Sequence, residues 1–136
     1  MATLPSDVNG VTVEFASTVD KNVVQSMVDA LKHCIKSDIA TGHVLQKIYV
    51  SSANDSHSAP SRHVQQKAVD ISRINGTKIV LGYPGVDEVK AIVQGIQDCF
   101  EGYAQRRENF GPYIKKKSGQ NWTVSGHDDH IHLSVE

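Results

Sequence analysis

The dipeptide Asn75-Gly76 constrains the fold of this chain more than any other feature of its sequence. Both residues tolerate the positive φ angles that a two-residue β-turn requires. The preceding residues 67–74 alternate, with Asp70 on one face and Val69 and Ile71 on the other. We therefore predict a β-hairpin whose return strand covers residues 77–81, so that part of the fold is antiparallel sheet.

Two helices and three further strands are expected around this hairpin. Apolar residues recur at helical spacing from Val19 to Ile35. A second helix should open at Pro84 and carry apolar residues as far as Tyr103. Residues 106–120 are typical of a mobile segment, and strands are expected at residues 11–16, 45–51 and 130–135. The sequence thus predicts an α+β fold in which two main helices pack on a small, mostly antiparallel sheet.

Length and charge limit the classes of protein to which the chain can belong. Its 136 residues fit one domain, residues 1–136, rather than two independent cores. Fourteen Lys and Arg against fifteen Asp and Glu give a net charge of -1, which argues against a general nucleic-acid binder. No apolar run approaches the roughly 18 residues of a membrane helix, and no signal peptide is recognised, so we expect synthesis in the cytoplasm. Cys34 and Cys99 lie in apolar helical patterns and are expected to be buried free thiols.

Seven histidines are an unusual number, and two short clusters hold the candidate chemistry. In the first cluster, His63 closes a loop and Asp70 lies on the following strand, so both can reach one point beside the sheet edge. In the second, His130 and His132 project from the same face, because side chains in a strand repeat every two residues. Two histidines and one carboxylate that converge with one position open form a catalytic zinc site. Zinc in such a site polarises a carbonyl and lowers the pKa of its water toward 7.

The paired motifs resemble a known group of enzymes. Ser61-x-His63-x-x-x-x-Ala68-x-Asp70, together with His130-Ile131-His132, is similar to the zinc D-Ala-D-Ala carboxypeptidase and murein endopeptidase families. These belong to a wider group that includes lysostaphin and hedgehog domains. The resemblance spans roughly residues 44–135 and implies that His63, Asp70 and His132 bind one zinc ion per chain. Gln66 departs from the family pattern, which usually has glycine there.

The resemblance leaves two candidates for the catalytic base. Carboxypeptidase-like members place an acidic residue three positions before the last zinc histidine, and Asp129 occupies that position. Penicillin-insensitive murein endopeptidases have His-x-x-His-x-His, which here is His127, His130 and His132. We favour His130 as the base, with His127 supporting it or the tetrahedral intermediate. A histidine can serve near neutral pH because a nearby metal charge favours its neutral form.

The substrate class follows from the same resemblance. Many relatives carry an arginine before the first zinc histidine, where it binds a substrate carboxylate, but residues 49–55 contain none. This favours an endopeptidase over a carboxypeptidase. Arg62 and Arg73 are other candidates for that charge, although each is more simply a solvated side chain. Tyr113 with the lysines at 115–117 is a candidate contact to anionic cell-wall polymer, and a charge run of that length is usually a solvated loop.

The function expected from these features is zinc-dependent hydrolysis of an amide bond in a peptidoglycan stem peptide or cross-link. Without a recognised signal peptide, the chain fits a phage lysin or an antibacterial effector that reaches the cell wall after lysis or dedicated export. An effector would be paired with an immunity or inhibitor protein. The alternatives are a D-Ala-D-Ala or L,D-carboxypeptidase or dipeptidase, and a non-catalytic zinc-containing binding domain of the hedgehog-like type.

Overall fold

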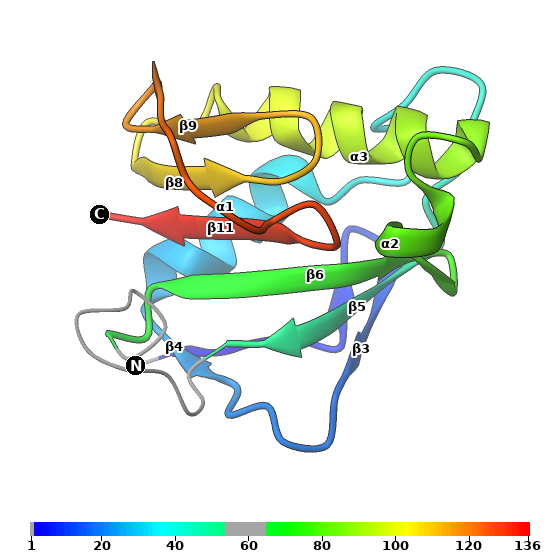
Figure 1. Ribbon diagram of the computed structural model, residues 1–136. Coiled ribbons are helices and arrows are strands. Elements are labelled where there is room, and N and C mark those ends of the chain that lie inside the picture. Colours follow the sequence, from blue (N-terminus) through cyan, green and yellow to red (C-terminus); the bar gives the residue numbers. More distant parts are fainter. Residues whose placement is uncertain (1, 54–64) are drawn as a thin grey trace.

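The fold is dominated by one large mixed sheet. The computed structural model describes residues 2–53 and 65–136, and everything below refers to these residues. Nine of their strands form one sheet in the order β10-β9-β8-β11-β6-β5-β3-β2, with β7 paired to β6, and β1 pairs with β4 separately (Figure 1). The strands are β1 Ala2–Thr3, β2 Asp7–Val8, β3 Val11–Phe15, β4 Asn22–Val23, β5 Lys47–Ser52, β6 Ala68–Ile74, β7 Thr77–Lys78, β8 Arg106–Phe110, β9 Lys115–Lys117, β10 Gln120–Asn121 and β11 Ile131–Val135.

The sheet combines one parallel pair with antiparallel neighbours. Strands β3 and β5 run parallel, and helix α1 (Gln25–Cys34) lies in the connection between them, as a crossover connection requires. The β6–β7, β6–β11, β11–β8 and β8–β9 pairs are all antiparallel. Strand β11 is therefore a central strand, hydrogen-bonded on both sides.

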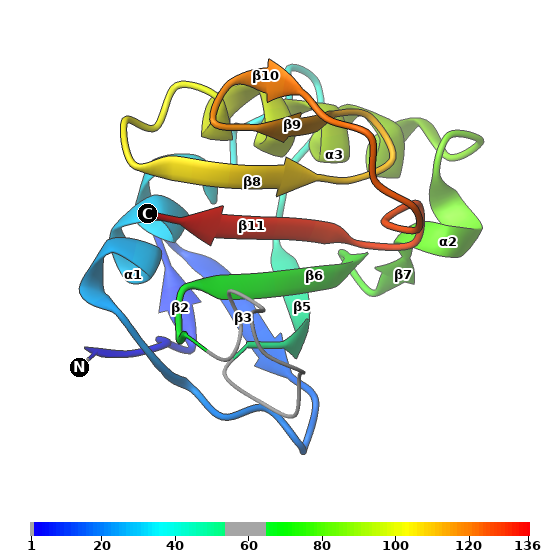
Figure 2. The ribbon, with the colours of Figure 1, turned by 60° about the vertical axis from the view of Figure 1, so that its left-hand side comes forward.

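Two longer helices cover one face of the sheet. Helix α3 (Asp87–Phe100) lies behind β8 and β9 in the view of Figure 2, and helix α1 lies behind β11 in the view of Figure 1. A short helix, α2 (Ile79–Gly82), follows β7. The buried side chains that join the helices to the central strands form a single apolar cluster, which includes Met27, Leu31, Ile92, Ile96, Phe100, Val69, Ile71, Ile131, Leu133 and Val135.

Asn75 fixes the predicted turn to the neighbouring chain. It has a φ of 49° and is followed by Gly76 at 84°, as the turn chemistry requires. Its side-chain oxygen accepts hydrogen bonds from the backbone N–H groups of Gln46 (2.7 Å) and Lys47 (3.1 Å). Its amide nitrogen donates to the Val44 carbonyl at 2.8 Å and to Glu88. The turn therefore also anchors the start of β5.

The prediction of two main helices on a small sheet is wrong. The described residues form a nine-stranded mixed sheet and a two-stranded sheet, with three helices. Much of the missed sheet lies within residues 106–120, which form β8, β9 and part of β10 instead of a mobile segment. These strands are rich in charged residues, which is why the sequence did not predict them. None of the three is fully buried, and the outer edge of β9 pairs only with the two-residue strand β10.

Element boundaries differ in three further places. Strand β7 stops at Lys78, and the residues expected to continue it form α2. The first helix begins at Gln25 rather than near Val19, because Asn22–Val23 pair with Ala2–Thr3. The second helix ends at Phe100, so Tyr103 packs against the core from the following turn.

No helix in the described residues is long and apolar enough to span a bilayer. Cys34 is buried, Cys99 is half-buried, and both are free thiols. Burial raises the pKa of the Cys34 thiol far above its usual value, so this thiol stays protonated.

Candidate functional site

The polar cluster lies on the face of the sheet opposite to the core. Strand β11 sends Ile131, Leu133 and Val135 into the apolar cluster, so His132 must point to the other face. The antiparallel register between β11 and β6 places His132 directly opposite Asp70. Residues 62 positions apart in the sequence are thereby brought into contact.

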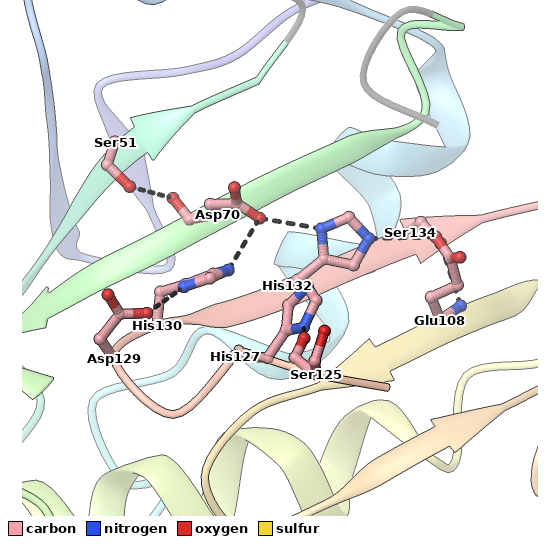
Figure 3. Close-up of polar contacts among 9 residues, drawn as sticks. All are labelled: Ser51, Asp70, Glu108, Ser125, His127, Asp129, His130, His132 and Ser134. Atoms are coloured by element: carbon pink, nitrogen blue, oxygen red, sulfur yellow. Dashed lines mark hydrogen bonds and ion pairs between the residues drawn. The ribbon is translucent and has the colours of Figure 1, made fainter. Parts of the chain in front are cut away.

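His132 lies between two carboxylates (Figure 3). Its Nδ1 is 2.9 Å from Oδ1 of Asp70, and its Nε2 is 3.0 Å from Oε1 of Glu108 on β8. The ring also stacks on Phe110, with 5.7 Å between centroids and 17° between planes. The imidazole is thus held from two edges and one face, and its side chain is only 10% exposed.

The electrostatics of this trio favour charge separation. Burial by itself lowers the pKa of His132, but hydrogen bonds to Asp70 and Glu108 outweigh burial and raise it to about 9. Burial also disfavours ionised Glu108, yet its hydrogen bonds with His132 and Ser134 lower the Glu108 pKa to about 2. Without a metal, the trio is therefore an imidazolium held by carboxylates.

His130 forms a second histidine–carboxylate pair beside the first. Its Nδ1 is 2.6 Å from Oδ1 of Asp129, and its Nε2 is 3.8 Å from Oδ1 of Asp70. The hydrogen bond with His130 lowers the pKa of Asp129, so Asp129 stays ionised and accepts the Nδ1 hydrogen. This leaves Nε2 as the basic nitrogen of His130, directed toward Asp70 (Figure 3).

His127 completes the histidine cluster from a strained backbone position. Its φ is 65°, a left-handed conformation that costs energy for any residue with a Cβ. This conformation places its ring 5.0 Å from that of His130 and 5.6 Å from that of His132, centroid to centroid. Its Nδ1 lies 3.0 Å from the Ser125 carbonyl, which accepts the hydrogen. Burial, together with the neighbouring histidines, lowers the His127 pKa and favours the neutral ring.

Five of the six predicted site residues lie together. Asp70, His127, Asp129, His130 and His132 form one cluster, while His63 lies outside the described residues. Two residues considered as substrate contacts, Arg73 and Lys115, have partners within the protein. Arg73 lies over the ring of Tyr49 at 4.4 Å, and Lys115 pairs with Asp128 at 2.8 Å.

Glu108 was missed by the reading of the sequence. It belongs to the run Arg-Arg-Glu-Asn-Phe, which carries no motif, and it reaches His132 only because β8 pairs with β11. No alternation of apolar and polar residues marks this run as a strand, so the sequence carries no local signal for Glu108.

The donor set suits a zinc ion only in part within the described residues. No three His, Cys, Asp or Glu side chains of residues 2–53 and 65–136 are arranged as a metal site. Asp70 Oδ1 and His132 Nδ1 are 2.9 Å apart, whereas two ligand atoms on tetrahedral zinc are about 3.3 Å apart. A shift of a few tenths of an ångström would therefore let both atoms bind one ion, with a third ligand required from elsewhere.

Comparison with known proteins adds no further assignment. No family model, no curated protein and no solved structure matches the chain. The resemblance to zinc peptidases therefore stays a prediction, which rests on the two motifs.

Proposed function

We propose that this chain is a zinc-dependent peptidase domain that hydrolyses an amide bond in peptidoglycan peptides. The observation that supports it most is the approach of Asp70 Oδ1 to His132 Nδ1, with His130 Nε2 directed at the same carboxylate. One carboxylate and one imidazole nitrogen would then be two of three protein ligands, and His63 is the proposed third. A catalytic zinc site has three protein ligands and an open position.

The proposed chemistry divides between the ion and the side chains. When bound, zinc would polarise the scissile carbonyl and make water a stronger acid. His130 is the proposed general base, which takes the proton from the attacking water through Nε2 and passes it to the leaving amine. Asp129 orients His130 through Nδ1 at 2.6 Å and stabilises the imidazolium that forms.

The pairing of His130 with Asp129 bears on the choice of base. Because Asp129 accepts the Nδ1 hydrogen, the two candidates would act as one unit, with His130 facing Asp70 and Asp129 behind it. His127, neutral and in ring contact with His130, is placed to support that ring or to donate to a developing oxyanion.

An endopeptidase remains the preferred activity. A carboxypeptidase needs a cation for the free carboxylate of its substrate, and Arg73 is engaged with Tyr49 instead. Arg62 lies outside the described residues, so the preference for an endopeptidase rests on the absence of arginine in residues 49–55. The stem peptide or cross-link as substrate rests on the resemblance to murein peptidases. Delivery as a phage lysin or exported effector is part of the same proposal.

The test is metal content by mass spectrometry before and after chelation, with muropeptide digestion on the same samples. One zinc per chain, with cleavage lost on chelation and restored by zinc, is the expected result. Free D-Ala among the products would identify a carboxypeptidase. Zinc without cleavage would favour the non-catalytic binding domain, and no zinc under any loading condition would refute the proposal.

Two variants separate metal binding from catalysis. Asp70→Asn should lose zinc and activity together, since the amide is a much poorer ligand. His130→Ala should keep zinc and lose turnover. If His130→Ala is active and Asp129→Ala is not, the base has been assigned wrongly.

A further inference from the structure

The Nε2 atom of His132 is held by Glu108, a residue that belongs to neither sequence motif. Nε2 of His132 lies 3.0 Å from Oε1 of Glu108, on the side of the ring away from Asp70 (Figure 3). Glu108 comes from β8, which pairs with β11. The contact thus joins two adjacent strands at the site itself.

Glu108 is itself fixed by the next outward-facing residue of β11. The Ser134 hydroxyl donates to Oε1 of Glu108 at 2.8 Å and accepts the backbone N–H of Glu108 at 3.0 Å. Ser134 is fully buried, so this pair is shielded from water. The Glu108 carboxylate is therefore held in one position relative to the His132 ring, whereas a glutamate side chain on the open surface would be free to move.

The consequence concerns which nitrogen of His132 carries hydrogen. An ionised carboxylate only accepts hydrogen bonds, so Glu108 requires a hydrogen on Nε2. In the metal-free protein Asp70 likewise accepts a hydrogen from Nδ1, at 2.9 Å, but zinc bound to Asp70 as proposed would replace that hydrogen and leave the lone pair on Nδ1. Metal-binding histidines commonly donate their other N–H to a carboxylate, which fixes the ring and raises the basicity of the ligand.

We infer that Glu108 is a positioning residue that presents His132 to zinc through Nδ1. The inference rests on the proposed zinc site and adds to it a requirement that neither motif contains. Phe110 restricts the ring from its face, and Glu108 sets the tautomer and the rotation about the ring axis. Loss of Glu108 should weaken zinc binding although it touches no zinc ligand atom.

The experiment measures zinc affinity by competition with a chelator for wild type, Glu108→Ala, Glu108→Gln and a matched control. Glu101→Gln is that control: the Glu101 side chain is 18% exposed against 19% for Glu108, but its carboxylate pairs with Arg106 instead of His132. Glu108→Ala should bind zinc about 10- to 100-fold more weakly than wild type. Glu108→Gln retains a hydrogen-bond acceptor without the charge and should lie between the two, and Glu101→Gln should bind as wild type.

A second readout reports the tautomer directly. Long-range ¹⁵N–¹H correlation spectra should show His132 of the zinc-loaded wild type with hydrogen on Nε2, and this signature should persist in Glu101→Gln. Should Glu108→Ala fail to fold, Glu108→Gln and Ser134→Ala carry the affinity comparison, the latter through loss of the 2.8 Å contact.

The experiment distinguishes failure of the proposed function from failure of the role inferred for Glu108. A wild type that binds no zinc refutes the proposed function and this inference with it. A wild type that binds zinc, with Glu108→Ala, Glu108→Gln and Ser134→Ala all binding equally well, overturns the role of Glu108 alone. Zinc bound through Nε2 of His132 would likewise overturn it.

Discussion

The left-handed backbone of His127 allows a test that separates local strain from the loss of a side chain. We compare His127→Gly with His127→Ala, because both variants lose the same ring contacts with Phe110, His130 and His132. At an ordinary position alanine is more stable than glycine by about 0.4 to 1 kcal/mol, since it restricts the unfolded chain. At a φ of 65° the Cβ costs roughly 1 to 2 kcal/mol.

The order of stability should therefore be inverted at this position. His127→Gly should exceed His127→Ala by about 1 kcal/mol. The entropy of unfolding is about 2.1 cal/mol/K per residue, or about 0.29 kcal/mol/K for 136 residues. The glycine variant should thus melt about 3 to 4 °C higher than the alanine variant, followed by circular dichroism with chelator present.

The neighbouring residue supplies the control pair. Asp128 does not have a positive φ, so Asp128→Ala should be the more stable of its own Ala and Gly variants. Both of these variants lose the ion pair to Lys115 equally. If His127→Ala equals or exceeds His127→Gly in stability, the strained conformation is not present, and the argument for His127 as a placed functional residue loses its basis.

Three other predictions concern pH, thiol reactivity and the hairpin. Because the pKa of His132 is raised, protonated His132 stabilises the metal-free protein fully below about pH 6.5, and this stabilisation is lost as pH rises through about 9. With chelator present, the difference in unfolding free energy between wild type and His132→Gln should therefore shrink between pH 7 and 9.5. A constant difference would contradict this. Buried Cys34 should resist alkylation in the native protein and react in urea, as measured by mass spectrometry, whereas labelling at the rate of Cys99 would show that it is accessible. Asn75→Ala should lower the unfolding free energy by about 2 to 3 kcal/mol, because several hydrogen bonds are lost at a positive φ; a loss under 1 kcal/mol in urea titration would refute this role.

The hairpin and the second helix were predictable because their signals are local. Asn75-Gly76 and the alternation before it lie within ten residues, and the apolar positions of α3 repeat along one helix. Strand alternation also predicts the face on which Asp70 and His132 lie, although the contact between them requires the pairing of β6 with β11.

The strands and the carboxylate that were missed depend on partners distant in sequence. Strand β4 exists because it pairs with β1, and its residues fit a helical pattern equally well. Strands β8 and β9 are rich in charged residues, and they form because β8 pairs with β11 and β9 pairs with β8. Glu108 becomes part of the site through that same pairing, 24 residues from His132, so no spacing rule within one segment could find it.

Because β11 is a central strand, the residues of the site are expected to differ in how readily their backbone opens. His132 belongs to a strand hydrogen-bonded on both sides, and such strands open only when much of the sheet unfolds. His127, Asp129 and His130 precede that strand in irregular chain, which opens at much lower free energy. Amide hydrogen exchange should therefore be slow at Leu133 and fast at Asp129. The group proposed to hold the metal would stay rigid while the groups proposed to move protons adjust to substrate.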